Sequence, residues 1–67
     1  MNAAEQKIAT KPTEMLIEIM ELSQTDQRPE VPTIRGWVMD ELERRDSEAF
    51  AAWLDSEDGS PRKFYLN

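Results

Sequence analysis

Apolar side chains recur at the spacing of an α-helix in three stretches of this chain, and this periodicity is the strongest constraint on its fold. Pro12 and Pro32 suit the first turns of the first two stretches, because a helix needs no backbone donor there. Asp46 is a favourable N-cap for the third stretch. The pattern predicts an all-α fold, a small three-helix bundle with helices over about residues 11–24, 32–45 and 47–55.

The two ends of the chain carry weaker helical signals than its middle. Residues 1–10 are polar with few large apolar side chains, of which Ile8 is the one that could pack on the bundle, and they predict a flexible N-terminal tail. Near the other end, the sequence Gly-Ser-Pro disfavours a helix, so residues 56–67 are predicted to form a flexible C-terminal tail. The helical domain is therefore expected over residues 11–55.

The C-terminal tail contains one apolar cluster, formed by Phe64, Tyr65 and Leu66. Two interpretations are open at this point. The cluster either packs back over the bundle or serves as a short linear motif that adds to a groove or sheet edge of another protein.

On a helical wheel of about 100° per residue, each predicted helix has one apolar face. The predicted core residues on these faces are Leu16, Ile19, Met20, Ile34, Trp37, Val38, Leu42, Phe50, Trp53 and Leu54. Ile17 and Met39 lie at the margins of the first two faces and extend the apolar surface beyond a narrow seam. Either a two-sided core buries both residues, or they contact a partner or a second copy of the chain.

The chain is short and contains neither cysteine nor histidine. At 67 residues it forms one domain and buries only about 60% of the surface that its unfolded chain exposes, which leaves its stability marginal. Disulfides are excluded, and so is a zinc site or a general base that depends on histidine. The sequence therefore predicts no metal, no cofactor and no enzymatic activity. A homodimer or a bound partner is the reinforcement that remains.

The formal net charge is −6, from 14 acidic and 8 basic residues. A chain of this charge is repelled by phosphate backbones, which argues against nucleic-acid binding. A partner protein with a basic surface would be attracted instead. No stretch has the apolar length of a signal peptide or of a membrane span, so we expect no membrane association and a cytoplasmic location.

Three glutamates form an acidic stripe on the first predicted helix, at positions i, i+4 and i+7: Glu14, Glu18 and Glu21. Like charges at i and i+4 destabilise a helix by roughly a few tenths of a kcal/mol. The stripe is therefore either a solvated face or the footprint of a basic partner. With the two marginal apolar residues added, the predicted partner-binding residues are Glu14, Ile17, Glu18, Glu21 and Met39.

Two other charge patterns have a simpler explanation than a site. The segment DSEDGS mixes carboxylates with glycine, but its glycine is the fifth residue, whereas a calcium-binding EF-hand loop needs glycine at the sixth. Arg44 and Arg45 are accounted for by i, i+4 ion pairs with Asp40 and Glu41. A basic nucleic-acid site is not needed to explain them.

These features predict a small acidic helical module for protein–protein interaction that acts as an accessory or regulatory factor. The alternative is an acidic inhibitor that mimics nucleic acid and blocks a basic groove on a DNA- or RNA-binding protein. Its carboxylates would then take the place of phosphates. Steep loss of binding with rising salt would favour the inhibitor, because an apolar contact responds weakly to salt.

Overall fold

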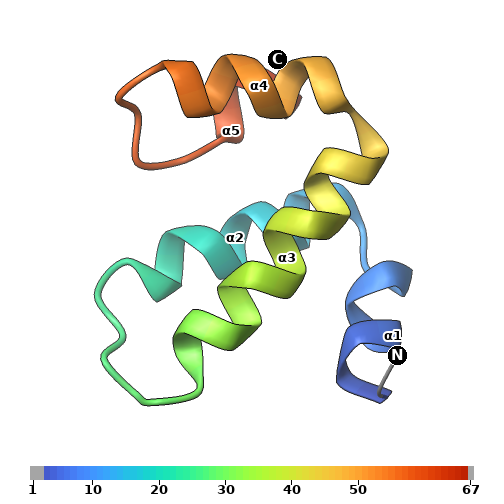
Figure 1. The fold of residues 1–67 in the computed structure, drawn as a ribbon, viewed down its shortest axis with the longest axis vertical. Coiled ribbons are helices and arrows are strands. Elements are labelled where there is room, and N and C mark those ends of the chain that lie inside the picture. The colour runs from blue at the N-terminus through green and yellow to red at the C-terminus, as the bar shows by residue number, and fades with distance from the viewer. Residues whose placement is uncertain (1–2, 67) are drawn as a thin grey trace.

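The computed structural model describes residues 3–66, which form helices and their connections, with no strand in that range. The helices are α1 (Ala3–Thr10), α2 (Thr13–Ser23), α3 (Val31–Arg45), α4 (Ser47–Asp55) and α5 (Arg62–Tyr65). α3 contacts α1, α2 and α4, and α5 contacts α2 and α4. Figure 1 shows α3 crossing α2, with α4 and α5 beyond the C-terminal end of α3 and α1 to one side. The predicted all-α bundle is confirmed, and two short helices are added at its ends.

α2 begins where the sequence predicts, directly after Pro12. The Pro12 carbonyl accepts a hydrogen bond from the Met15 backbone N–H at 3.0 Å, and the helix starts without a side-chain cap. At the other end of α2, the Arg35 guanidinium of α3 donates to the Met20 carbonyl at 3.2 Å and to the Ser23 hydroxyl. Arg35 thereby supplies a donor to the last turn of a helix, where carbonyls lack partners within the helix.

Asp46 separates α3 from α4, as the sequence predicts. Its backbone is extended, and its carboxylate accepts a hydrogen bond from the Ala49 N–H at 3.0 Å. The Tyr65 hydroxyl donates to the Leu42 carbonyl at 2.7 Å and lies 3.2 Å from the Asp46 carbonyl oxygen. The N-cap prediction is confirmed, and the segment at α5 supports the same joint through contacts that the local sequence does not reveal.

The core lies where α2, α3 and α4 meet, and the short terminal helices add to it. Its buried cluster consists of Ile8, Leu16, Ile17, Met20, Val38, Leu42, Phe50 and Trp53. Three further predicted core residues, Ile19, Ile34 and Trp37, are half-buried and pack against this cluster. Leu54 is 58% exposed, because the step of about 100° from Trp53 turns it towards solvent. Its assignment to the core is wrong.

Ile17 belongs to the core and not to a contact surface. It is fully buried and belongs to the same core cluster as Leu16 and Leu42, so the buried face of α2 is wider than one narrow seam. The prediction that Ile17 binds a partner is therefore wrong. Met39 is half-buried and packs against the same cluster. A two-sided core thus takes up both marginal residues.

Residues Ala3–Thr10 form α1, where the sequence predicts a tail. Ile8 is buried in the core cluster, and α1 contacts α3. The Arg45 guanidinium of α3 binds the C-terminal end of α1. It donates to the carbonyl of Ala9, in the last turn, at 3.2 Å and to that of Lys11, just after the helix, at 2.7 Å. The tail prediction is corrected for this segment, and residues 1 and 2 lie outside the described range.

The C-terminal segment also packs on the bundle. The Trp53 indole N–H donates to the Asp58 carbonyl at 2.9 Å, and Pro61 is fully buried. The apolar cluster of this segment packs against the core with half-buried side chains, namely Phe64, Tyr65 and Leu66. Residues 56–66 are therefore a loop and a helix of the folded domain, in place of the predicted tail, because they bury apolar surface. Asn67 lies outside the described range.

Candidate functional site

α2 presents apolar side chains on its outer surface as well as in the core. Leu22 is 74% exposed and Met15 is 43% exposed, and Ile19 is half-buried between them. These three residues are spaced i, i+4 and i+7, so they form one strip along the helix. Exposed apolar side chains gathered in a strip are a feature of protein contact surfaces.

The strip borders a groove of about 210 Å³ between the end of α2 and the start of α3. The apolar residues that line this α2–α3 groove are Ile19, Leu22, Val31 and Ile34. Asp26 and Arg28, from the connection between the two helices, line it as well and form an ion pair with an N–O distance of 2.6 Å. The groove therefore combines an aliphatic lining with a charged pair.

Two exposed glutamates, Glu14 and Glu18, run along the same strip one turn apart. Among residues 3–66, neither carboxylate has an ion-pair partner. The pKa of Arg62 is raised, first by its hydrogen bond to Glu21 and to a smaller extent by the charges of these two residues. The acidic edge and the apolar strip together are named the α2 face, which consists of Glu14, Met15, Glu18, Ile19 and Leu22.

Glu21, the third residue of the predicted acidic stripe, forms an ion pair and hydrogen bonds with residues of the same chain. Its carboxylate accepts hydrogen bonds from Arg62 Nε at 2.8 Å and Nη2 at 2.9 Å, and from the Ser60 hydroxyl at 2.7 Å. The Arg62 hydrogen bond, followed by that of Ser60, lowers the pKa of Glu21 from 4.5 to about 2. Glu21 connects α2 to α5, so its assignment to a partner surface is corrected.

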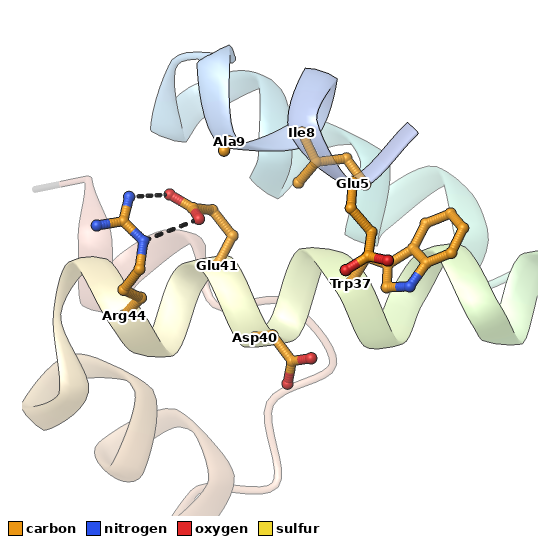
Figure 2. A pocket seen from close by; sticks show the side chains of 7 residues that line it. All are labelled: Glu5, Ile8, Ala9, Trp37, Asp40, Glu41 and Arg44. Atoms are coloured by element: carbon orange, nitrogen blue, oxygen red, sulfur yellow. Dashed lines mark hydrogen bonds and ion pairs between the residues drawn. The ribbon is translucent and has the colours of Figure 1, made fainter. Parts of the chain in front are cut away.

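A second pocket, of about 190 Å³, lies between α1 and α3 (Figure 2). Its lining residues are Glu5, Ile8, Ala9, Trp37, Asp40, Glu41 and Arg44. In Figure 2, the Glu5 carboxylate lies near the Trp37 ring, and the ion pair of Arg44 with Glu41 lies at the opposite end of the pocket. Sequence reasoning missed this pocket because it assigned residues 1–10 to a tail. The signal that could have revealed it is Ile8, a large apolar residue in a polar segment.

Glu41 is the buried carboxylate of this second pocket. Its Oε2 lies 2.5 Å from Arg44 Nη2 and 2.6 Å from Arg45 Nε. The hydrogen bond from Arg44 is the largest cause that lowers the pKa of Glu41 from 4.5 to about 2; burial opposes it, and Arg45 adds to it. The predicted pairing of Glu41 with Arg45 is confirmed, whereas Arg44 pairs with Glu41 and not with Asp40. Two arginines neutralise Glu41, so its role is structural.

We expect the protein to lose stability as the pH falls. The folded-state pKa values of Glu21 and Glu41 are about 2, below the ordinary value of 4.5, so the unfolded chain takes up protons first. The stability from these groups is present above about pH 4.5 and is lost between about pH 4.5 and pH 2. Thermal unfolding followed by circular dichroism should therefore show a lower midpoint at about pH 3 than at neutral pH.

Glu41→Gln should flatten part of this pH dependence, because an amide does not titrate. The matched control Glu18→Gln removes the same charge from an exposed position of α2 and should follow the parent curve. A parent protein whose midpoint does not fall between neutral pH and about pH 3 would show that these carboxylates do not contribute as described.

Sequence reasoning only partly anticipated the α2–α3 groove. A helical wheel places Leu22 on the apolar face of α2 and Val31 on that of α3, which suggests core for both. Packing shows that Val31 is buried whereas neighbouring helices leave Leu22 uncovered. The signal that could have indicated the groove is an apolar face that continues to the last turn of α2, next to the interhelical connection.

The described residues offer few other sites. Within residues 3–66, no group of three or more acidic side chains is placed to hold a metal ion. No helix in that range has both the length and the apolar character needed to cross a membrane. Comparison with protein-family models, curated proteins and solved structures gives no match for this chain. Its function is therefore inferred from the α2 face and the α2–α3 groove.

Proposed function

We propose that this protein is a small non-catalytic module for protein–protein interaction, an accessory or regulatory factor of the cytoplasm, and that it binds through the α2 face and the α2–α3 groove. The observation that carries the proposal is the 74% exposure of Leu22 beside an aliphatic groove. Single exposed apolar residues are common on proteins. Leu22 differs because Ile19, Val31 and Ile34 line the same groove, so a partner that covers Leu22 would also contact this aliphatic lining.

The chemistry of the chain supports a role without catalysis. The sequence has no cysteine nucleophile, and it has no histidine, the usual general base and the usual activator of a serine or threonine nucleophile. The two carboxylates with the most strongly lowered pKa values, Glu21 and Glu41, are held ionised by arginines. A carboxyl with a pKa of about 2 is a poor general acid or base near neutral pH.

The surface is tested by placing a charge in the apolar strip. The tagged parent and the Leu22→Asp variant are used to capture proteins from the native host, and Leu54→Asp serves as the matched control. Both leucines are exposed, so both variants should stay folded, as circular dichroism can verify. We expect one partner to be retained by the parent and by Leu54→Asp and to be lost from Leu22→Asp. Retention by all three proteins would rule out this surface.

The second candidate is an acidic inhibitor that mimics nucleic acid and occupies a basic groove on a DNA- or RNA-binding protein. The observation in its favour is the exposed pair Glu14 and Glu18, which lie one helical turn apart on the same side of α2. Raising the salt from about 50 mM to about 500 mM should release the target of such an inhibitor, because exposed charges are screened at that ionic strength. A partner held by the aliphatic groove should stay bound. Nucleic acid itself is not proposed as a partner, given the net charge of −6.

A second copy of the chain is another occupant that the groove could accept. Light scattering of the purified protein gives the mass in solution and separates a homodimer from a monomer. A dimer that dissociates in Leu22→Asp but persists in Leu54→Asp would assign the surface to self-association.

A further inference from the structure

We infer that the partner segment that binds the α2 face is a positively charged amphipathic helix of another protein. The inference rests on the function proposed above and names the chemistry of the partner at that same surface.

The shape of the surface suits a helix with aliphatic side chains. From Met15 to Leu22 the apolar strip covers eight residues of α2, a length of about 10 Å, or two turns of a helix lying alongside. The groove at its end measures about 210 Å³. An apolar cavity of roughly 150 Å³ admits a benzene molecule, so this groove has room for a leucine-sized side chain. Residues 3–66 contain no strand edge to which an extended peptide could add, so a helix is the favoured form of the partner segment.

The charge beside the strip selects the sign of the partner. Glu14 and Glu18 are exposed, lie one turn apart and have no ion-pair partner among residues 3–66. Lysine or arginine residues spaced one turn apart on the partner helix would face them while its aliphatic residues enter the groove. The net charge of −6 would also accelerate the encounter with a basic segment.

The same charges disfavour a second copy of the chain as the occupant. In a symmetric dimer, each α2 face would contact the other α2 face. The interface would then bring together two copies of Glu14 and of Glu18, four carboxylates with no cation on either α2 face, and like charges placed together across an interface are repulsive. A basic helix removes this repulsion, and so the charge distribution favours a different protein as the partner.

A synthetic helical peptide of leucine and lysine, with leucine at i, i+3, i+4 and i+7, tests the inference. Two control peptides are a leucine–glutamate version with the same spacing and a leucine–lysine version with scrambled order. Binding to the full chain is measured by isothermal titration calorimetry. We expect the leucine–lysine helix to bind, the glutamate version not to bind, and the scrambled version to bind more weakly, because its lysines and leucines no longer occupy separate faces.

Variants of the protein locate the binding site of the peptide. Leu22→Ser should weaken binding about tenfold or more, since a buried leucine contact is lost. The double variant Glu14→Gln/Glu18→Gln should weaken it about threefold or more, as expected for two exposed ion pairs. The matched controls, in which exposed residues elsewhere are changed in the same way, should bind as the parent does; they are Leu54→Ser and Glu43→Gln/Glu48→Gln.

Several results would overturn the inference. These are equal binding of the glutamate peptide, no binding of the leucine–lysine helix, unchanged affinity in Glu14→Gln/Glu18→Gln, or self-association that Leu22→Ser abolishes. Failure of the inference alone is recognised by a native partner that needs Leu22 but binds Glu14→Gln/Glu18→Gln as well as it binds the parent. A native partner that still binds Leu22→Asp would instead refute the proposed function itself.

Discussion

Trp53→Ala should destabilise the fold by about 3–5 kcal/mol, a large fraction of the total stability of a small domain. The Trp53 ring is buried in the core and contacts Phe50 edge to face, with 5.7 Å between ring centroids. Its indole N–H donates to the Asp58 carbonyl at 2.9 Å, which fastens the C-terminal loop to α4. The substitution removes the ring volume, the aromatic contact and this hydrogen bond together. Much of the protein should therefore unfold at physiological temperature.

Trp37→Ala is the matched control, because the same side chain is removed from a half-buried position. Trp37 lines the pocket between α1 and α3 and packs against the core cluster without belonging to its buried set. We expect a cost of about 1–2 kcal/mol, with a cooperative transition retained. Urea unfolding followed by far-ultraviolet circular dichroism compares the two variants without depending on tryptophan fluorescence. Equal midpoints for both variants would contradict the burial described for the two rings.

Arg45→Met should be the second most damaging change, at about 2–4 kcal/mol. The Arg45 side chain is only 20% exposed, and its guanidinium bonds to Glu41, to the Thr13 hydroxyl and to two carbonyls, one in the last turn of α1 and one just after it. Methionine keeps most of the aliphatic stem but supplies no donor. We expect α1 to detach before the rest of the fold, because this side chain bonds the last turn of α1 and the residue after it to α3. Hydrogen exchange should rise first in Ala3–Thr10.

Arg44→Met is the control for the ion pair itself. Arg44 also pairs with Glu41 and is the larger cause of the lowered pKa of that carboxyl, but its side chain is 68% exposed. Among residues 3–66, the bonds of Arg44 go to Glu41 and not to the carbonyls that Arg45 holds, so hydrogen exchange in α1 should stay close to that of the parent protein. Arg45→Lys gives a further test, because a single ammonium cannot reach all the acceptors of the guanidinium fork. Equal protection of α1 in Arg44→Met and Arg45→Met would show that Arg45 does not hold this helix.

The helices of the bundle could be predicted because their signals are local. Apolar periodicity within each stretch, Pro12 before α2, Pro32 in the first turn of α3 and the Asp46 cap all depend on residues within a few positions of one another. The acidic edge was partly predictable for the same reason. Glu14 and Glu18 lie one turn apart on an exposed surface, as the helical wheel indicates.

The role of Glu21 could not be predicted in this way. The wheel groups it with the other two glutamates, but its partner Arg62 lies 41 residues further along the chain. No local sequence pattern indicates an ion pair between residues so far apart in the chain. Ile17 was misplaced for a related reason. The wheel puts it at the margin of the apolar face, but it is fully buried in a core cluster whose other members, such as Val38 and Phe50, lie far along the chain.

The sequence by itself determined that this chain is helical, where its three longer helices begin and end, and that its charge is acidic. Only the tertiary structure decided how α2 is rotated, which apolar residues remain outside, and how α1 and α5 are held. The physical reason is the range of the interactions. Helix formation and capping act over about four residues, whereas burial of Ile17, exposure of Leu22 and the bonds of Arg45 depend on segments that meet only when the chain folds.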